Sequence, residues 1–311
     1  MQVERKMMVV VTLLGMGMMS VVASPITMTV DEGVVIGEKT EEQALGWMLE
    51  TTVGLDFSSK QVTYGLIDNP QGILTPSFEL AWQHEEGLRL AIGVEALFDT
   101  TNFGAKEGGY NNRRWKYQEL DPYITLSKTW DTEEALGGAF VTELGYVYEY
   151  HPRSCKKPAQ EWSNPDTQWL NLSIGLEDDF LNPTFTVEYQ LARQGAEGDT
   201  DGKGGLYATF EISHTFDIGA QMGMEDGVLC LTPGAGIGVA NKHRNRADFE
   251  QDDAFMFRDA FASLELAYAP VDGLTIAPYI ACHQQLDSAA KEAVGDDDFV
   301  AYAGLGIAYT F

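Results

Sequence analysis

The chain has 311 residues, of which 44% are hydrophobic and 11% aromatic, with 32 glycines and a formal net charge of -27. This composition is too apolar for a disordered chain, and such an acidic excess excludes a nucleic-acid binder, which would carry a basic stripe. A strongly acidic protein instead favours cations as partners, and the length suits one large domain such as a β-barrel.

The first 25 residues, MQVERKMMVVVTLLGMGMMSVVASP, have the organisation of a secretory signal peptide. Arg5 and Lys6 form a basic start, residues 7–22 form an apolar run that is short for a membrane span, and Val21 and Ala23 give a small-residue cleavage site. We therefore predict a signal peptide over 1–23. Residues 24–45 are polar and acidic, and we expect them to form a periplasmic lead-in to a barrel domain over 46–311.

From residue 46 onward, bulky apolar residues recur at alternate positions, which is the period of a β-strand and not of a helix. In the first segment, for example, Trp47, Leu49, Val53, Leu55 and Phe57 share one face. Each segment has about ten residues, the length that a tilted strand needs to cross a bilayer. Twelve such strands are predicted, at 47–57, 74–83, 88–98, 119–130, 139–150, 167–177, 184–193, 206–216, 228–241, 261–269, 274–284 and 300–311.

The links between these strands are alternately long and short, with one link of intermediate length, DIGAQMGMEDG, after the eighth strand. SSKQVTYGLIDNPQG is followed by HEEG, DTTNFGAKEGGYNNRR by DTEEALGG, and KHRNRADFEQDDAFMFRD by PVDG. A soluble sandwich would show the same strand period, but this alternation of links is typical of outer-membrane barrels, which have short periplasmic turns and long outer loops. We therefore predict an all-β fold, a transmembrane antiparallel up-and-down β-barrel of about 12 strands. In the first long link, residues 62–67 could extend the neighbouring strands.

The last predicted strand keeps its alternation to the final residue, as AYAGLGIAYTF. Its bulky positions are Leu305, Ile307, Tyr309 and Phe311, and small or polar residues lie between them. This stretch resembles the terminal signature of bacterial outer-membrane β-barrel proteins, and the general layout is similar to small twelve-stranded channels and to porin-like proteins of the TorF type. The resemblance implies residence in the outer membrane, contact with its lipid, and recognition of those four residues by the barrel-assembly machinery.

The phase opposite to the apolar one is expected to face the lumen, and it is rich in acidic residues. Arg89 is the one basic residue that the pattern places securely there, while Lys128 falls on the lipid phase near the rim, where its amine can reach water. Carboxylates without partners are tolerated only where water reaches them, and acidic rings favour cations. Inward glycines such as Gly234, Gly236 and Gly238 are expected to add room. The predicted pore-lining residues are Glu50, Asp56, Glu79, Arg89, Glu95, Asp99, Glu119, Asp121, Glu143, Glu149, Glu177, Glu188, Glu211, Asp259 and Glu265.

These features predict a porin-like channel for passive diffusion of small solutes, with a preference for cations or for neutral and cationic solutes. Two alternatives stay open: a structural or adhesive barrel without transport and, with weaker support, a barrel-embedded lipase. A lipase needs a serine beside an oriented histidine, and neighbouring Ser213 and His214 would point to opposite faces of a strand. We predict no catalytic residue, no metal site and no cofactor. The glycine run PGAGIG does not indicate a nucleotide site, because it lies inside a strand with no helical pattern after it. The oligomeric state is left open.

Overall fold

The structure, a computed structural model, describes residues 9–10, 27–28, 46–70, 72–100, 116–131, 138–150, 166–177, 181–193, 204–249, 255–294 and 298–311. The predicted signal peptide and lead-in lie outside these residues, apart from two short strands, β1 (Val9–Val10) and β2 (Thr27–Met28), which pair with each other. The assignment of this region as an exported leader stays a prediction.

From residue 46 onward, the described chain consists mainly of long strands. These are β3 (Trp47–Ser58), β6 (Ile73–His84), β7 (Leu88–Asp99), β8 (Lys116–Asp131), β9 (Ala139–Glu149), β10 (Thr167–Glu177), β11 (Thr184–Arg193), β12 (Leu206–Ser213), β14 (Leu229–Ala240), β15 (Met256–Val271), β16 (Leu274–Gln285) and β17 (Phe299–Thr310). The shorter elements are β4 (Gln61–Thr63), β5 (Leu66–Asn69), β13 (Phe216–Asp217), α2 (Ile218–Gln221), α3 (Lys242–Phe249) and α4 (Ser288–Val294).

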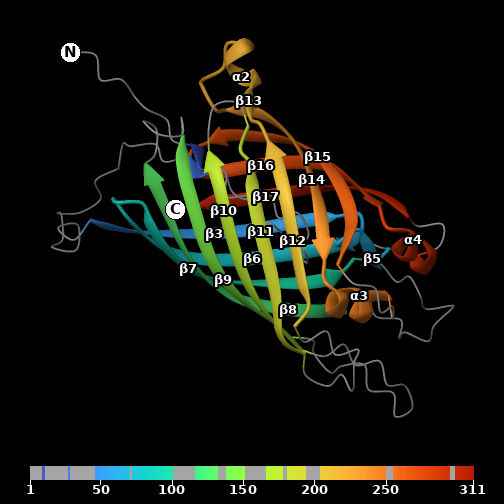
Figure 1. Cartoon of the computed structure of the whole chain (residues 1–311). Helices are drawn as coiled ribbons and strands as arrows, with labels where there is room; N and C mark the ends of the chain where they lie inside the picture. Colours follow the sequence, from blue (N-terminus) through green and yellow to red (C-terminus); the bar gives the residue numbers. More distant parts are fainter. Residues whose placement is uncertain are drawn as a thin grey trace, which may run out of the picture.

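The twelve long strands form one closed antiparallel barrel (Figure 1). Strands next to each other in sequence pair with each other, and β3 pairs with β17 to close the ring. The predicted fold class and strand number are thus confirmed. One predicted strand, 206–216, is interrupted: β12 ends at Ser213 and β13 resumes at Phe216, and both pair with β14.

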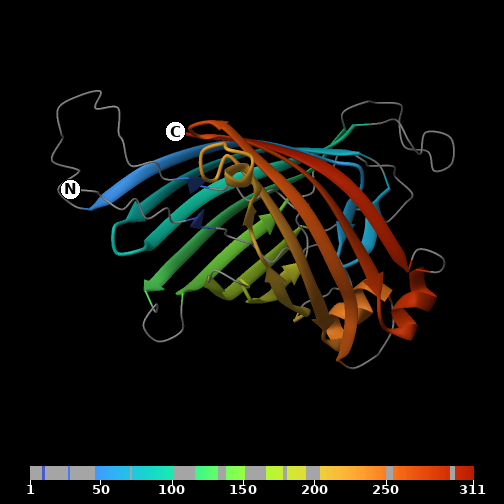
Figure 2. The same ribbon diagram turned by 90° about the horizontal axis from the view of Figure 1, so that it is seen from above.

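The two ends of the barrel carry different connections (Figures 1 and 2). The β4–β5 hairpin, α3 and α4 lie at one end, and α2 lies at the other, together with the start of β3 and the end of β17. Following the predicted topology, we call the end with α3 the outer end and the end with α2 the inner end.

The outward face of the barrel is apolar. Along β3, Leu49, Val53, Leu55 and Phe57 are each at least 40% exposed, as a lipid-facing row would be. Aromatic side chains near the strand ends are also exposed, and they include Trp47, Trp130, Tyr150, Phe216, Tyr309 and Phe311. No helix in the described part of the chain is both long and apolar enough to cross a membrane.

Lys128 lies on the outward face near the inner rim. Its amine donates to the carbonyl of Glu86 in the β6–β7 turn and lies 5.4 Å from the centre of the Trp130 ring. A lysine in such a place keeps its aliphatic stem on the apolar surface while its charge reaches the polar rim, as the sequence led us to expect.

Inside the barrel, three tyrosines each span three strands. Each ring lies over a glycine of the neighbouring strand, and its hydroxyl donates to a carboxylate of the strand beyond. The distance between the two oxygens is 2.9 Å from Tyr123 to Glu79, 3.3 Å from Tyr279 to Asp56 and 2.7 Å from Tyr207 to Asp259. A Cβ added to any of these glycines would lie within 2.0–2.3 Å of the tyrosine. We call these sets the tyrosine bridges: Tyr123–Gly93–Glu79, Tyr279–Gly304–Asp56 and Tyr207–Gly238–Asp259.

The sequence led us to expect that the inward glycines add room to the lumen, and their contacts in the structure show that this expectation is wrong. Gly236 lies against the Phe261 ring, and Gly238 and Gly304 lie against tyrosines. A Cβ on Gly234 would come within 2.8 Å of the hydroxyl of Ser263. These positions lack a side chain because a neighbouring strand already fills the space over them.

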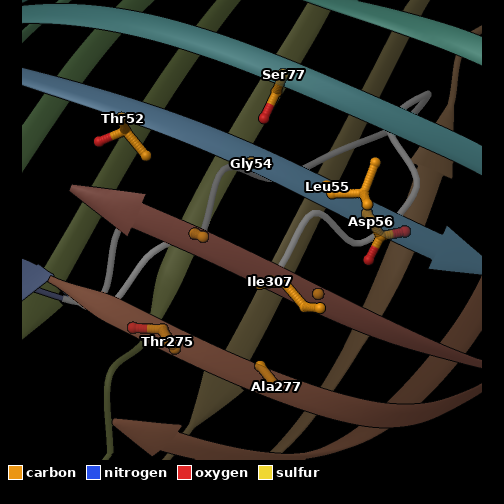
Figure 3. A pocket seen from close by; sticks show the side chains of 10 residues that line it. Thr52, Gly54, Leu55, Asp56, Ser77, Thr275, Ala277 and Ile307 are labelled. Carbon is orange, nitrogen blue, oxygen red and sulfur yellow. The ribbon is translucent and has the colours of Figure 1, made fainter. Parts of the chain in front are cut away.

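The first and last strands meet in a seam with small inward side chains. Gly54 pairs with Ala308, and Asp56 pairs with Gly306. A shallow pocket lies along this part of the wall (Figure 3), and its lining includes Thr52, Gly54, Asp56, Ser77, Thr275 and Ala277.

At the inner end, the seam is fastened by hydrogen bonds near its last residue. Thr51 and Phe311 exchange two backbone hydrogen bonds, of 2.9 and 3.0 Å. The hydroxyls of Thr52 and Thr310 lie 3.0 Å apart. The final residue of the sequence is therefore part of the barrel wall.

Replacing Gly304 with alanine is expected to destabilise the barrel, because the new methyl group would meet the Tyr279 ring at 2.2 Å. Overpacking of this kind costs about 1–3 kcal/mol. Gly145→Ala is the matched control, because the atom nearest to its added Cβ is 3.5 Å away. Thermal unfolding in detergent, followed by the mobility shift of the folded barrel on SDS gels, should show a lower midpoint for Gly304→Ala. Equal midpoints for the two variants would contradict this packing role.

Candidate functional site

The fifteen predicted pore-lining residues all lie in the described strands, and each is at least partly buried. The buried ones, with at most 6% exposed, are Asp56, Glu95, Asp121, Glu143, Glu149, Glu188 and Asp259. The half-buried ones are Glu50, Glu79, Arg89, Asp99, Glu119, Glu177, Glu211 and Glu265. Contact with water in this conformation falls mainly to the second group, and a conducting path along these residues stays a prediction.

Three of the buried carboxylates form a row across β7, β8 and β9. Glu95 lies directly opposite Asp121, and the bridge between Leu120 and Tyr150 places Glu149 opposite Asp121 on the other side. Like charges at directly opposed positions repel one another. This acidic row therefore places three carboxyl groups side by side on one section of the inner wall.

Glu79 and Arg89 form an ion pair on the inner wall of β6 and β7. The Tyr123 hydroxyl donates to the other oxygen of Glu79 at 2.9 Å. Arg89 therefore lies on the inward face, as the alternation indicates, and it offsets one carboxylate among many.

Two buried arginines at the outer end escaped the sequence interpretation, which placed Arg89 alone among the inward acids. Arg244 of α3 and Arg258 of β15 are 4% and 0% exposed. Both bind the same carboxylate oxygen of Asp248, Arg244 through Nε at 2.9 Å and Arg258 through Nη1. The acidic wall thus includes a basic pair near its outer end.

A β-bulge explains why Arg258 could not be found from the alternation. Gly238 of β14 pairs with Asp259, but the next residue, Val239, pairs with Phe257, so Arg258 is an extra residue in β15. Arg258 and Asp259 are both fully buried, whereas Phe257 is 60% exposed. Bulges re-aim side chains in this way. Strict alternation would have put Arg258 on the lipid-facing side.

The β4–β5 hairpin folds across the outer end and packs on the inner wall (Figure 2). Val62 packs against Tyr279, Val300 and Tyr302 of β16 and β17. The two hairpin strands pair with each other. Residues 62–67 therefore do not extend the neighbouring strands, which was one reading of the sequence.

Tyr64, at the tip of the hairpin, contacts residues of β11, β12 and β16. Tyr64 and Gly65 both have positive φ, 50° and 74°, as the central residues of a type I′ turn must. A non-glycine residue in this region is uncommon and strained. Tyr64 is 2% exposed, its ring lies 4.1 Å from that of Tyr207, and its carbonyl accepts from Gln285 at 3.1 Å.

The Tyr64 hydroxyl donates to Glu188 of β11 at 2.8 Å. Burial raises the pKa of Tyr64, and the charge of Glu188 raises it further. The phenol therefore keeps its proton and serves as a hydrogen-bond donor at neutral pH.

Arg244 and Arg258 stack around the Tyr64 ring. The guanidinium carbon of Arg244 lies 4.4 Å from the centre of the Tyr64 ring and 5.0 Å from that of Trp169. That of Arg258 lies 5.0 Å from Tyr64. We call this assembly, which joins the hairpin, α3 and three wall strands, the outer cluster: Tyr64, Trp169, Glu188, Arg244, Asp248 and Arg258.

Asp248 is the anion at the centre of the outer cluster. Its burial opposes ionisation, but Arg244 and Arg258 together outweigh burial and hold the pKa of the Asp248 carboxyl below its usual value. The carboxylate is therefore charged at neutral pH, and α3 is held to the wall by charge-assisted hydrogen bonds.

A second polar chain runs along β12, β15, β16 and β17. Asp259 accepts from the Tyr207 hydroxyl at 2.7 Å and pairs with Nδ1 of His283 at 3.0 Å. Nε2 of His283 lies 3.5 Å from the hydroxyl of Tyr302. An aspartate–histidine pair is one half of a nucleophilic triad, but here a tyrosine lies beside the second nitrogen, where a triad has its serine.

Within the described ranges, no three or more histidine, cysteine, aspartate or glutamate side chains are grouped so as to hold a metal ion.

Comparison with known proteins gives similarity in structure and none in sequence families. No family model and no curated protein matches the chain. Among solved structures, a KdgM porin is 11% identical with a TM-score of 0.42, covering 84% of this chain and 99% of the porin. The COG4313 outer membrane channel from Pseudomonas putida F1 is 10% identical with a TM-score of 0.44, covering 91% of this chain and 100% of the channel.

Outer membrane phospholipase A from Escherichia coli is also similar, at 11% identity and a TM-score of 0.43, with 83% of this chain and 89% of the enzyme covered. These values are too low for any residue or activity to be carried over to this chain.

Replacing Asp248 with asparagine is expected to lower the free energy of unfolding at neutral pH by about 3 kcal/mol, because two buried guanidinium groups lose their anion. The folded-state pKa of Asp248 lies below its unfolded value, which is about 3.9. The contribution of the charge is therefore fully present above that pH and is lost as the pH falls through the folded-state pKa.

Thermal unfolding of both proteins in detergent between about pH 7 and about pH 2 tests this linkage. The gap between them should stay constant down to about pH 4 and then shrink. Asp226→Asn, at an exposed position near the inner end, should match the native protein throughout. A gap that persists unchanged into strong acid would show that the charge of Asp248 does not hold the outer cluster.

Proposed function

We propose that this chain is an outer-membrane channel of the porin type, which lets small cations and small neutral or cationic solutes diffuse across the membrane. The observation that carries the proposal is the charge of the inner wall. Fourteen of the fifteen predicted pore-lining residues are acidic, and each is at least partly buried on the strands of a closed barrel whose outward face is apolar.

The structure adds two arginines, Arg244 and Arg258, to the predicted Arg89, and the acidic excess survives all three. Arg89 is paired with Glu79, and Arg244 and Arg258 are paired with Asp248. Carboxylates on the wall of a narrow passage attract cations and repel anions.

Two features restrict the proposed passage to small solutes. A barrel of twelve strands lies between eight-stranded barrels, which are filled by side chains, and sixteen-stranded porins, which hold a wide channel. The outer end is narrowed further, because the hairpin crosses it and Tyr64 is held against Tyr207 on the other side.

The alternative of a barrel-embedded lipase has one observation in its favour, the pairing of Asp259 with His283. The hydroxyl beside the second nitrogen of that histidine belongs to Tyr302. The pair is also part of the tyrosine bridge from Tyr207, which gives it a structural role in the wall. We therefore place the channel before the enzyme.

Two half-buried acids on either side of β14 are expected to set part of the selectivity. Glu211 lies opposite Gly236, and Glu265 lies opposite Thr232, so no bulky charged group of β14 separates them. In the variant Glu211→Gln/Glu265→Gln, the permeability ratio of potassium to chloride should fall towards one, since two negative charges are removed from the water-facing wall.

The measurement is the reversal potential of the purified barrel in a planar bilayer under a potassium chloride gradient. Glu85→Gln/Glu86→Gln, which removes two exposed acids from the β6–β7 turn, should keep the native ratio. Anion preference in the native protein would overturn the proposed selectivity. Absence of current together with hydrolysis of phospholipid in detergent would favour the lipase, and absence of both would favour a structural barrel.

A further inference from the structure

Arg244 occupies a site that is built to hold a guanidinium group. Its guanidinium lies between the faces of Tyr64 and Trp169, at 4.4 and 5.0 Å from the ring centres. Nη1 donates to Oε1 of Gln190 at 3.4 Å, and Nε donates to Asp248 at 2.9 Å. The side chain is 4% exposed, so this site surrounds it nearly completely.

The components of this site come from different parts of the fold. Tyr64 belongs to the hairpin, Trp169 to β10 and Gln190 to β11, whereas Arg244 and Asp248 both belong to α3. The wall and the hairpin therefore supply two aromatic faces and an amide oxygen, and helix α3 supplies the cation. Glu149 and Glu188 add negative charge near the guanidinium.

Two aromatic faces, a hydrogen-bond acceptor and nearby carboxylates are together what binds a planar cation. Aromatic faces attract cations through their quadrupole, and arginine stacks on such faces more readily than lysine because its guanidinium is planar and more weakly hydrated. The same groups would bind a guanidinium group on a free solute as they bind the one on Arg244.

We propose that Tyr64, Trp169 and Gln190, with Glu188 behind them, form a recognition site for solutes that carry a guanidinium group, and that Arg244 fills this site when no solute is present. The inference rests on the proposed channel function and deepens it by naming a class of cationic solute. A solute of this class that arrives at the outer end displaces the Arg244 side chain and takes its place between the two rings.

The exchange should change the free energy little, because one guanidinium group replaces another in the same contacts. The helix exposes Lys242 and His243 to solvent, and its attachment to the wall runs through the polar contacts of Arg244 and Asp248. A tethered group competes as if it were present at a concentration on the order of millimolar. Free arginine should therefore displace it in the same concentration range.

The variant Arg244→Ala empties the site and tests the proposal directly. Isothermal titration calorimetry of this variant in detergent should detect saturable binding of L-arginine and of ethylguanidinium, with little binding of urea, which is planar but neutral. The native protein should bind the same ligands at least about tenfold more weakly than Arg244→Ala does, since its own arginine competes for the site. Adding Tyr64→Ala should weaken binding by about tenfold, because one aromatic face is lost.

The matched control is Arg246→Ala, which removes the same charge from the same helix and should behave as the native protein does. The mobility shift on SDS gels reports whether each variant is folded. Arg244→Lys provides a second test if the alanine variant fails to fold. Lysine keeps the charge but leaves the planar site incompletely filled. Arginine should therefore still bind more tightly to Arg244→Lys than to the native protein.

Bilayer recording separates a failure of this inference from a failure of the channel function. Millimolar guanidinium should reduce the current through Arg244→Ala more than the same concentration of urea does. If no variant conducts, the channel proposal fails, and calorimetry still decides the guanidinium site. If Arg244→Ala binds arginine no better than Arg246→Ala does, or binds urea equally well, the guanidinium site is wrong whether or not the barrel conducts.

Discussion

A buried carboxylate on the inner wall needs a hydrogen-bond donor close at hand, because burial removes it from water. In this chain four inner carboxylates accept from a tyrosine hydroxyl: Asp56, Glu79, Glu188 and Asp259. Each tyrosine bridge reaches over one strand to a carboxylate on the next but one, and the strand in between must carry glycine to let the ring pass. Three acids, three tyrosines and three glycines that are distant in the sequence are therefore parts of one arrangement.

At the outer end, arginine takes the place of tyrosine as the hydrogen-bond donor to a carboxylate. Asp248 receives two guanidinium groups, and both of them lie within 5.0 Å of the centre of the Tyr64 ring. These contacts fasten the hairpin and α3, two segments outside the barrel strands, to the inner wall. Cationic groups that lie over aromatic rings are thus part of what holds the outer end of the barrel together.

Much of the fold could be predicted from the sequence, since a closed barrel forces every strand into alternation and the links reveal which end each strand faces. The inner wall could be predicted only in part. Arg258 lies at a bulge, which breaks the alternation on which the prediction depended. The hairpin contact of Tyr64 and the ring over Gly304 depend on which strands become neighbours and at what register. Such contacts between distant segments leave no local pattern.

The seam between β3 and β17 has a consequence for how the barrel finds its correct register. Its inward side chains include Gly54, Gly306 and Ala308, and strands rich in small residues specify their pairing weakly by themselves. The tyrosine bridge from Tyr279 over Gly304 to Asp56 crosses this seam, so a slip of two residues would break it. The hydrogen bonds between Thr51 and Phe311, and the contact of Thr52 with Thr310, mark one alignment of the seam. The register of the two closing strands therefore depends on these contacts across the seam.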